Sequence, residues 1–419
     1  MLDVAIVGGG LSGLALAHGL AARRLLFRLY EARDRLGGRI LSVPSGRGGR
    51  VDLGATWFWT ETQPSITRLV DDLGLPSQAQ LDDGRVLSLS DPNRGPQTLS
   101  VTPEFDASES AAAQPGRLHG GAQRLSGGMA TLTETLVQRI QRMAGWQQAG
   151  GQADPLRCGH ALTELRRLPG GGVELHLKHG AVAYAVHARH VVLALPPRLA
   201  LQTVHFSPGL DASLREVMAA TPTWMASAAK AALVADRPFW REQGHSGNAW
   251  ASHPQAVLAE VFDACGEPGA TAAPDPLPTE VAHAALAGFF ALSAEQRASF
   301  ATAMPLLLQS QFAQLFGLAA QDDAHQILQQ DWATEAWTCS TLDRAEDGRA
   351  PGGHPPYGDA RLTQGLWDGA LWLAGSETAA HGGGYAEGAL SAAARVQRAL
   401  LARLLPGQNG AGSHRPAAA

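Results

Sequence analysis

A run of glycines between an apolar strand and a helix is the feature that most constrains the fold of this chain. Residues 8–13 read Gly8-Gly9-Gly10-Leu11-Ser12-Gly13 and supply the pattern G-x-G-x-x-G. The apolar segment Leu2 to Val7 predicts a short buried strand before the run, and the spacing of apolar residues in Leu14 to Arg23 predicts a helix after it. This order of elements is the context in which the pattern binds a dinucleotide.

The glycines and one acidic residue each have a specific role in this interpretation. Gly8 allows a tight turn, Gly10 lets the backbone approach a pyrophosphate, and Gly13 lets the helix pack closely on the strand. The helix N-terminus offers N–H groups and a partial positive charge to the phosphates. Glu31 follows the predicted strand Phe27 to Tyr30 and is placed to accept hydrogen bonds from a ribose diol. The carboxylate of Glu31 disfavours the 2′-phosphate of NADP. The pattern does not separate NAD from FAD.

Composition limits the compartment and the partners of the chain. With 419 residues, 45% hydrophobic and 17% charged, it is long enough for two domains, and its net charge of -5 favours no nucleic acid partner. Three widely separated cysteines are typical of a reducing compartment. The first strand begins by Asp3, which leaves no space for a leader, and no apolar run reaches a membrane span. We expect a cytoplasmic protein without a membrane partner, and a homodimer remains open.

Longer motifs point to a family. The segment Glu31-Ala32-Arg33-Asp34-Arg35-Leu36-Gly37-Gly38-Arg39, followed by Val51-Asp52-Leu53-Gly54-Ala55-Thr56-Trp57, strongly resembles the flavin monoamine oxidase family of FAD-dependent amine oxidases. The resemblance extends over nearly the whole chain. It includes the glycine turn Leu125 to Met129, the Pro-Pro strand end in Val191 to Leu199, and two C-terminal segments, Leu373 to Ala379 and Gly383 to Ala389.

The resemblance implies an α/β fold, in which a Rossmann-like FAD-binding domain of the GR2 type, glutathione-reductase-like, is interleaved with an α+β substrate domain. We place the FAD-binding domain at 1–76, 120–205 and 336–405, the substrate domain at 77–119 and 206–335, and a flexible tail at 406–419. The Ser-, Asp-, Pro- and Gly-rich residues 76–120 mark the first boundary. Val173 to Lys178, Gly180 and Ala181 to Leu195 predict a hairpin. Strands are expected at 228–235 and 257–263, a helix at Ser299 to Leu318, a surface loop at 265–279 and a frayed end from Gly407.

The same resemblance implies a set of FAD-binding residues. Arg33 and Arg39 would neutralise the pyrophosphate, and Gly54-Ala55 would allow close approach to the isoalloxazine ring. The helix that begins near Tyr385 would direct N–H groups at the flavin C2 carbonyl. The expected residues are Gly8, Gly10, Ser12, Gly13, Glu31, Ala32, Arg33, Gly38, Arg39, Gly54, Ala55, Thr56, Trp57, Leu162, Gly375, Glu377, Tyr385 and Ala386.

Two residues are expected to be catalytic. Lys230 lies in an apolar segment eight residues before Pro238-Phe239-Trp240, a spacing shared with the family, whose lysine holds a water against flavin N5. Burial of a lysine is costly and shifts its pKa. The alternative is an edge-strand lysine that points to solvent. Tyr385 matches the aromatic wall that faces the flavin in the family, and its alternative is a core tyrosine at a helix start.

The rest of the substrate pocket departs from the family pattern. The second aromatic of the family falls near Leu342, so Trp337 or Tyr357 would compensate, and Trp57, Phe58 and Trp59 would line the pocket or belong to the core. The family's covalent flavin cysteine falls near Thr341, two residues from Cys339, so we expect FAD to be non-covalent. The amino-acid oxidases of the family place an arginine just after the Gly54-Ala55 motif to hold a carboxylate. This chain has Thr56-Trp57 there, so the resemblance favours a simple amine over an amino acid.

The implied reaction transfers a hydride from the carbon next to a neutral amine to flavin N5. The imine product hydrolyses to an aldehyde or ketone, and oxygen is the expected acceptor, which gives hydrogen peroxide. Carotenoid desaturases and protoporphyrinogen oxidases share the first motif, so oxidation of a hydrophobic substrate is an alternative. A flavin-stabilised interaction protein with little turnover is another. The fifteen histidines form no metal or catalytic set, and no metal is predicted.

Overall fold

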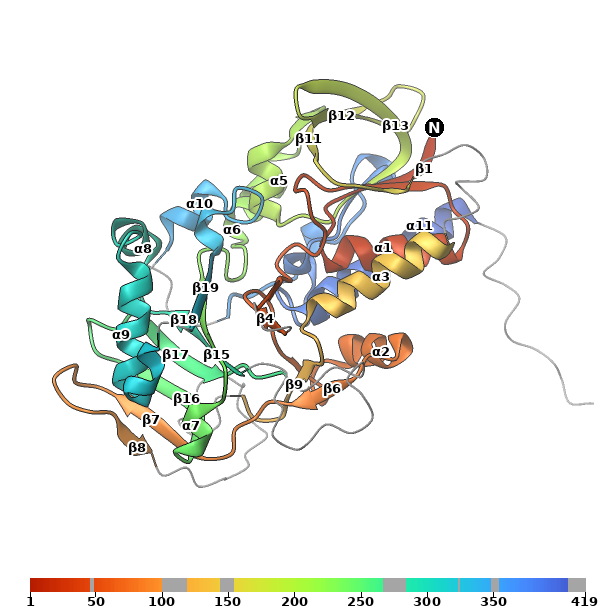
Figure 1. The fold of residues 1–419 in the computed structure, drawn as a ribbon. Helices are drawn as coiled ribbons and strands as arrows, with labels where there is room; N and C mark the ends of the chain where they lie inside the picture. The colour runs from red at the N-terminus through yellow and green to blue at the C-terminus, as the bar shows by residue number, and fades with distance from the viewer. Residues whose placement is uncertain are drawn as a thin grey trace, which may run out of the picture. The chain divides into compact units, whose positions relative to one another are not determined.

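The computed structural model describes residues 1–45, 49–99, 119–143, 154–266, 284–322, 325–347 and 354–405. The chain forms two compact units, both built from separate stretches (Figure 1). Unit 1 comprises Met1–Gly38, Leu136–Pro222 and Pro356–Ala419, and unit 2 comprises Arg39–Thr135 and Thr223–Pro355. The predicted tail 406–419 and residues 267–279 of the predicted loop lie outside the described residues.

The units differ from the predicted domain boundaries at four stretches. Residues 39–76, 120–135 and 336–355, which we expected in the FAD-binding domain, belong to unit 2, and residues 206–222, which we expected in the substrate domain, belong to unit 1. The reason for the first of them is packing. Val51 and Leu53 share a hydrophobic core with Ala232 and Val234, so the chain joins the second core soon after Gly38. Which function each domain carries stays a prediction.

Unit 1 is built on an eight-stranded sheet. Its order is β10-β2-β1-β13-β12-β11-β14, with β20 beside β13. The strands are β1 (Leu2–Val7), β2 (Phe27–Tyr30), β10 (Leu156–Arg157), β11 (His160–Arg167), β12 (Val173–His179), β13 (Val182–Leu193), β14 (His205–Ser207) and β20 (Leu371–Leu373). β1 runs parallel to β2 and β13, and β13 runs parallel to β20. The carboxyl ends of these four strands therefore meet at one edge, where dinucleotides bind in such sheets.

The predicted strands and hairpin of unit 1 are confirmed. β1 and β2 have the predicted bounds, and β12 and β13 pair antiparallel on either side of Gly180, whose φ of 57° lies in the left-handed region. The first helix, α1 (Leu11–Ala22), begins three residues before the predicted Leu14. The second half of the glycine motif therefore forms the first helical turn.

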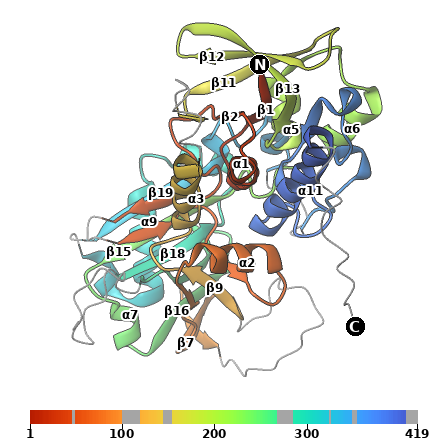
Figure 2. The ribbon, with the colours of Figure 1, turned by 90° about the vertical axis from the view of Figure 1, so that its right-hand side faces the viewer.

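Helices cover the unit 1 sheet and connect its strands. They are α5 (Pro197–Thr203), α6 (Ala212–Ala220), α11 (Ala386–Leu404) and the short turns η3 (Ala360–Leu362), η4 (Trp367–Gly369) and η5 (Ser376–Thr378). α3 (Ala130–Met143) crosses the boundary between the units. Figures 1 and 2 show α1 and α11 side by side. A Cβ on Gly19 would lie 2.4 Å from the Gln397 side chain. The helices α1 and α11 therefore pack in direct contact.

Unit 2 is built on a seven-stranded sheet of order β19-β15-β18-β17-β16-β7-β8. These strands are β7 (Arg85–Leu89), β8 (Gln97–Leu99), β15 (Ala229–Ala235), β16 (His245–Ala251), β17 (Leu258–Asp263), β18 (Ala284–Phe290) and β19 (Gln326–Asp331). Two smaller sheets join β3 (Ser42–Pro44) to β4 (Arg50–Asp52) and β5 (Phe58–Trp59) to β9 (Ala122–Leu125) and β6 (Ser77–Ala79).

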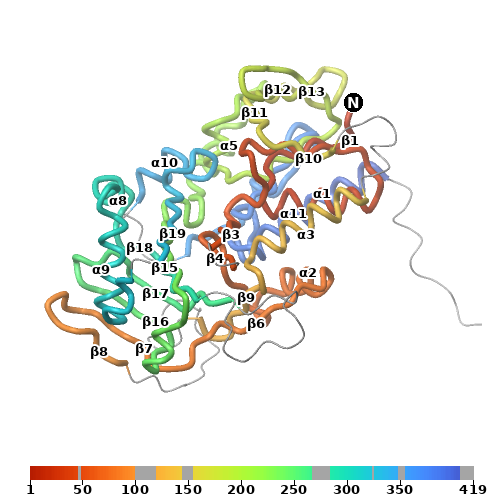
Figure 3. The backbone as a smooth tube through the Cα atoms, viewed as in Figure 1, coloured from red at the N-terminus to blue at the C-terminus, as the bar shows by residue number. Residues whose placement is uncertain are grey.

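The helices of unit 2 lie between its strands in sequence. They are α2 (Pro64–Leu73), α7 (Phe239–Glu242), α8 (Ala294–Ser299), α9 (Met304–Phe316), α10 (Thr341–Ala345), η1 (Leu318–Gln321) and η2 (Trp332–Thr334). The predicted strands at 228–235 and 257–263 are present as β15 and β17. The predicted helix at Ser299 to Leu318 is present as α9, which lies beside the sheet (Figure 3). Leu308 and Phe312 of α9 share a core with Leu233, on one face of the sheet.

No helix within the described ranges combines the length and apolar character that crossing a membrane requires.

Candidate functional site

The glycine turn after β1 has the geometry that its sequence predicts. Gly8 has φ of 106°, and a Cβ there would lie 2.5 Å from the Ala194 carbonyl oxygen. A Cβ on Gly13 would lie 2.0 Å from the Gly8 carbonyl oxygen. A side chain at Gly8 would clash with the chain that leaves β13, and a side chain at Gly13 would push α1 away from the turn. Because the α1 N-cap is Gly10, which has no side chain, the first N–H groups of the helix are left for a ligand.

Glu31 ties this turn to the loop that follows β2. Its carboxylate accepts a hydrogen bond from the Gly9 N–H at 2.7 Å and another from the Arg33 N–H at 2.9 Å. The Arg33 guanidinium lies 3.7 Å from the same carboxylate, and Ala32 lies between the two residues in the chain. A carboxylate oxygen accepts two hydrogen bonds, so each Glu31 oxygen keeps a site for a ribose hydroxyl. Glu31 therefore shapes the loop as well as offering a ribose contact.

A second glycine pair lies directly against the first turn. The Gly37 N–H donates to the Gly9 carbonyl at 2.8 Å, and a Cβ on Gly38 would lie 3.1 Å from the Gly10 Cα. The nearest atom to a Cβ on Gly10 is the Gly38 Cα at 3.9 Å. The two loops thus approach without side chains between them. This open cradle at a helix N-terminus fits a pyrophosphate.

The C-terminal motif is joined to the same edge of the unit 1 sheet. The Ser12 hydroxyl donates to the Ala374 carbonyl at 2.5 Å, and a Cβ on Gly375 would lie 2.2 Å from the Leu195 carbonyl oxygen. Glu377 is fully buried and accepts a hydrogen bond from the Ser376 hydroxyl at 2.9 Å. The N-terminal and C-terminal motifs predicted to bind FAD therefore meet within unit 1.

Two further predicted residues lie elsewhere in unit 1. Tyr385 is the N-cap of α11 but its side chain does not cap the helix, and the Gly388 N–H of the first turn donates to the Gly382 carbonyl at 2.9 Å. The Tyr385 side chain is 38% exposed, which argues against the alternative of a core tyrosine. Leu162 lies in β11 and packs into the hydrophobic core of the unit. Any contact of Leu162 with FAD stays a prediction.

Lys230 is buried on an inner strand of the unit 2 sheet, next to the edge strand β19. It lies on β15, which pairs with β19 on one side and β18 on the other, so the alternative of a solvent-facing edge lysine is wrong. Alternation along the strand places Lys230 on the same face as Ala232 and Val234. Lys230 is 4% exposed. Its ammonium donates to the Gly54 carbonyl at 2.7 Å and to the Thr56 hydroxyl at 2.6 Å.

Three aromatic rings surround the Lys230 ammonium. Its Nζ lies 5.1 Å from the ring centroid of Trp57, 5.5 Å from that of Phe262 and 4.6 Å from that of Phe289. Burial lowers the pKa of Lys230 to about 8, although the Asp52 and Glu260 carboxylates oppose the shift. The ammonium is therefore a charge held near its titration point in an apolar setting.

The segment that carries Gly54 and Thr56 packs against the backbone of Arg39. A Cβ on Gly54 would lie 2.1 Å from the Arg39 carbonyl oxygen, and the Ala55 N–H donates to the same oxygen at 3.1 Å. The Arg39 guanidinium donates to the Trp224 carbonyl at 3.0 Å. The glycine in the second motif is thus required by a backbone contact, and Arg39 also has a structural role within unit 2.

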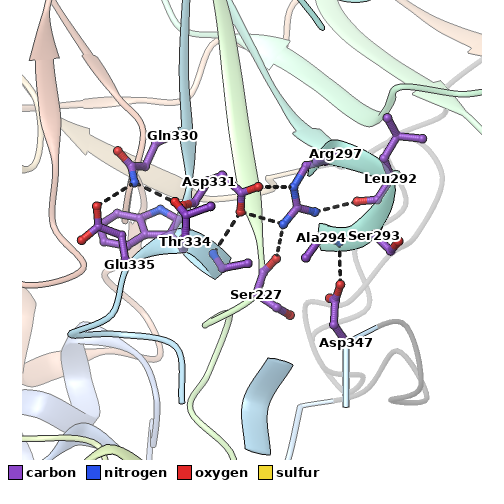
Figure 4. Close-up of polar contacts among 12 residues, drawn as sticks. Ser227, Leu292, Ser293, Ala294, Arg297, Gln330, Asp331, Thr334, Glu335 and Asp347 are labelled. Atoms are coloured by element: carbon purple, nitrogen blue, oxygen red, sulfur yellow. Dashed lines mark hydrogen bonds and ion pairs between the residues drawn. The ribbon is translucent and has the colours of Figure 1, made fainter. Parts of the chain in front are cut away.

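An ion pair between a buried arginine and a partly exposed aspartate anchors the end of the strand next to Lys230. Arg297 of α8 makes two hydrogen bonds to the carboxylate of Asp331, at 2.8 and 2.7 Å (Figure 4). The same guanidinium donates to the Leu292 carbonyl at 2.6 Å and the Ser227 carbonyl at 2.7 Å. Asp331 is the last residue of β19 and pairs with Ala229, the residue before Lys230. The ion pair therefore holds the end of β19 beside the part of β15 that carries Lys230.

The predicted aromatic pocket residues divide between the units. In unit 2, the Trp57 indole N–H donates to Gln80 at 2.8 Å, while Trp337 and Leu342 are 36% and 42% exposed. In unit 1, the Tyr357 hydroxyl donates to the Pro222 carbonyl at 2.9 Å. A Cβ on Gly383 would lie 2.5 Å from the Tyr357 Cβ, so Tyr357 lies against the loop that leads to Tyr385. These two tyrosines are the predicted aromatics that unit 1 brings near one another.

Three rings around Lys230 and Trp57 were not predicted from the sequence. Phe289 pairs with Lys230 across β15 and β18, Phe262 contacts the ring of Trp57, and His119 stacks on Trp57 with centroids 4.0 Å apart. The register between strands, which places them beside the lysine, has no local signal in the sequence.

The histidines of the hairpin contact carboxylates and carbonyls. His176 and His187 both contact Glu174, at 2.7 and 2.8 Å, and His190 contacts the Gly369 carbonyl at 2.8 Å. Within the part of the chain that the structure describes, no group of three or more His, Cys, Asp or Glu residues is arranged to hold a metal ion.

The fold defines the class of protein. It is an α/β protein with a Rossmann-like FAD-binding fold of the glutathione-reductase type interleaved with an α+β substrate-domain fold. Residues 6–73 match the family described as NAD(P)-binding Rossmann-like domain, and residues 98–401 match the family described as flavin containing amine oxidoreductase. The chain belongs to the flavin containing amine oxidoreductase family, and its cofactor is FAD. It is an oxidoreductase that acts on amines.

Relatives and solved structures agree with this assignment. The chain is 25% identical over 468 residues to the flavin-containing amine oxidase B of Sus scrofa, across 95% of this chain and 86% of that protein. The fold is similar to cyclohexylamine oxidase from Brevibacterium oxydans, with a TM-score of 0.68, 18% identity and coverage of 96% and 99%. It is also similar to a putrescine oxidase bound to putrescine, with a TM-score of 0.66, 19% identity and the same coverage.

Glu31→Ala is expected to weaken FAD binding by about 1 to 3 kcal/mol, the typical loss when a buried polar partner is left unpaired. The change removes the predicted ribose contact and the two hydrogen bonds that hold the loop. Titration of the apoprotein with FAD, followed by flavin fluorescence, measures the difference. Unchanged affinity would mean that the ribose is held by another residue.

Proposed function

We propose that this chain oxidises a neutral amine by removing a hydride from the carbon next to nitrogen. Bound FAD supplies the redox chemistry, because it accepts the hydride at N5 and passes the electrons to oxygen, which leaves as hydrogen peroxide. The imine product is hydrolysed by water to an aldehyde or ketone and an amine or ammonia. The observation that carries the proposal is the buried ammonium of Lys230, which lies on an inner strand, 4.6 to 5.5 Å from the centroids of three aromatic rings.

The residues of the chain bind, orient and exclude water. In this proposal Lys230 presents a positive charge in a desolvated site, and Gly54 and Thr56 fix the direction of its ammonium. Tyr385 supplies an aromatic wall that orients the amine. No strong general base is required, because the substrate amine is neutral when it reacts. The family assignment does not favour the desaturase type of reaction or an inactive binding protein.

The chemistry of the cysteines supports non-covalent attachment of FAD, the form typical of the family. Burial raises the pKa of the Cys339 thiol to about 11 and that of Cys265 to about 12, and it also raises the pKa of Cys158. The thiolate is the nucleophilic form of cysteine, so none of the three is prepared to attack a flavin. The free state of all three also supports a reducing, cytoplasmic compartment.

Acid precipitation of the purified yellow protein is expected to release FAD into the supernatant, because no thiol is activated to form a bond with it. The absorbance of the supernatant and of the pellet measures the two fractions. Yellow colour retained in the washed pellet would show a covalent link.

Tyr385→Ala is expected to slow anaerobic reduction of the flavin by an amine, while FAD stays bound. The reason is that the half-exposed ring orients substrate, whereas the expected contact with FAD at this position is made by backbone N–H groups, which an alanine retains. Rapid mixing with amine, followed by flavin absorbance, measures the rate. Tyr184→Ala, a change of a tyrosine on the β13 strand, is the matched control. An unaltered reduction rate in Tyr385→Ala would place the amine elsewhere.

The function itself is tested by a screen for hydrogen peroxide. The FAD-loaded protein is mixed with aliphatic and aromatic amines in air, and peroxide is measured with a peroxidase-coupled dye. We expect peroxide with at least one simple amine. Peroxide from amino acids alone would contradict the preference for simple amines.

A further inference from the structure

A buried carboxylate, that of Asp52, lies in the same interior of unit 2 as Lys230. Asp52 ends β4 two residues before Gly54, whose carbonyl accepts from the Lys230 ammonium at 2.7 Å. Two residues of extended chain span about 7 Å at most. Asp52 is 6% exposed and Lys230 4%. Both charges are therefore close to one another and away from water.

The Asp52 carboxylate is held by neutral donors. Its Oδ1 accepts a hydrogen bond from the Ser42 hydroxyl and another from the Met129 N–H at 3.0 Å. Met129 directly precedes α3, so the carboxylate lies at the positive end of a helix of 14 residues. A Cβ on Gly128 would lie 3.0 Å from the same oxygen, so the glycine turn packs directly against it.

Neither charge has a direct partner of opposite sign. Among the described residues, the hydrogen bonds of the Lys230 ammonium go to the neutral Gly54 carbonyl and Thr56 hydroxyl, and the ammonium makes no ion pair. The Asp52 carboxylate makes none there either. Buried charges are normally compensated by a charge of opposite sign. The two groups therefore act on one another as a separated pair.

The charges that act on Lys230 differ in sign and in size. Burial lowers the pKa of Lys230, the Asp52 carboxylate opposes this shift most strongly, and Glu260 of β17 opposes it less. The Arg124 guanidinium of β9 lowers the pKa further. The Glu260 carboxylate is partly exposed and already contacts His119. Asp52 is therefore the carboxylate on which the charge of the lysine depends most.

The surroundings of Asp52 favour its charged form. Burial raises the pKa of its carboxyl group, whereas the Ser42 hydroxyl, the Arg124 guanidinium, the Met129 N–H and the Lys230 ammonium act to lower it. The N-terminus of α3 acts in the same direction as these four groups. The pKa of Lys230, about 8, lies about four units above the ordinary pKa of aspartate, which leaves room for a raised value.

We propose that Asp52 is the counter-charge of Lys230 and keeps the ammonium protonated in the pH range in which the reduced enzyme reacts with oxygen. Asp52 is a positioning residue in this role, because it acts through Lys230 and contacts neither substrate nor oxygen. The inference rests on the proposed part of Lys230 in reoxidation. Without the Asp52 charge, Lys230 loses its proton at a lower pH.

The direct test is an NMR titration of Lys230, which needs no substrate. The chain contains two lysines, Lys178 and Lys230, so protein labelled with ¹³C-lysine gives two Cε signals. Asp52→Asn removes the charge and keeps an oxygen for the Ser42 hydroxyl and the Met129 N–H. We expect the Lys230 midpoint to fall from about 8 by about one pH unit, the lower end of the range for a nearby opposite charge. The Lys178 signal should titrate alike in both proteins.

Glu260→Gln is the matched control, because it removes a carboxylate that is partly exposed and contacts His119. Its midpoint for Lys230 should fall less than that of Asp52→Asn. FAD content checks that each variant is folded. Asp52→Ser removes the same charge and replaces the asparagine variant if the latter does not fold. An unchanged Lys230 midpoint without the Asp52 charge would overturn the proposal, as would an equal fall in Glu260→Gln.

A second measurement connects this titration to the oxygen reaction. Enzyme reduced with dithionite is mixed with oxygen from pH 6 to pH 10, so no amine is needed. Reoxidation in Asp52→Asn should slow about one pH unit lower than in wild type. A shifted NMR midpoint with an unshifted reoxidation profile would contradict the part of Lys230 in reoxidation, and the inference with it. Failure of every amine to reduce the flavin would instead contradict the proposed function, and it leaves both of these measurements unaffected.

Discussion

Lys230→Met is expected to slow reoxidation of the reduced enzyme by oxygen by about tenfold or more. Oxygen becomes negatively charged as it accepts electrons, and a buried ammonium stabilises that charge. A factor of ten requires only about 1.4 kcal/mol, which a charge in a water-poor site readily supplies. Methionine keeps much of the stem volume of lysine, so the packing against Phe262 and Phe289 is retained.

The matched control is Lys178→Met. Lys178 is the other lysine of the chain and is exposed on β12, so its loss should change neither half-reaction. Rapid mixing of the reduced enzyme with oxygen measures reoxidation, and anaerobic mixing with amine measures reduction. If Lys230→Met leaves both rates unaltered, the proposed role is wrong. If it slows reduction alone, Lys230 positions the substrate.

The pKa of Lys230 predicts a pH dependence of the same step. Because burial lowers this pKa to about 8, the ammonium is charged below that pH and loses its proton above it. Reoxidation is therefore expected to slow as the pH rises through about 8, and Lys230→Met should lose this dependence. The rate constant measured from pH 6 to pH 10 in both proteins checks the expectation. A slope of the same size in the variant would assign the titration to another group.

Asp331→Ala is expected to lower the free energy of unfolding by about 2 kcal/mol, less than for a fully buried ion pair, because the side chain of Arg297 is buried but that of Asp331 is 25% exposed. The change leaves the Arg297 guanidinium, whose side chain is 6% exposed, with two carbonyl acceptors and no counter-charge (Figure 4). It also removes the acceptor that caps the N-terminus of η2 through the Ala333 N–H. Urea unfolding, followed by tryptophan fluorescence, measures the loss.

The control for Asp331→Ala is Glu134→Ala. Glu134 pairs with Arg50 at 2.8 Å, but both side chains are more than a third exposed. An exposed pair contributes about 0 to 1 kcal/mol, so this variant should unfold close to the wild type. Equal losses in the two variants would mean that the pair of Arg297 and Asp331 carries no special stability.

Local patterns predicted the parts of the structure that depend on neighbouring residues. The glycine turn, the strands β1 and β2 and the hairpin around Gly180 follow from steric rules and short-range alternation. The start of α1 was misplaced because Leu11 to Gly13 satisfy the phosphate-binding pattern and the first helical turn together. The extent of unit 2 was not predicted, because packing of Val51 and Leu53 against β15 is a long-range contact.

The sequence predicted some residues of the candidate site but not their long-range partners. Glycine-rich motifs identified the cradle in unit 1, and the rarity of lysine drew attention to Lys230. Its partners came from the structure alone, since Phe289 is placed by strand register and Gly54 by a contact across the chain. His119 lies at the end of a long polar stretch, where no local pattern indicates that its ring stacks on Trp57.

The central claim is that this chain oxidises amines with its bound FAD. The most direct measurement is the visible absorbance of the FAD-loaded protein, mixed with a simple amine or diamine in the absence of oxygen. The account predicts that the yellow colour bleaches within the turnover time and returns on addition of air, with one hydrogen peroxide formed for each flavin reoxidised. An oxidised spectrum that persists with every amine, in protein that dithionite reduces normally, would contradict it.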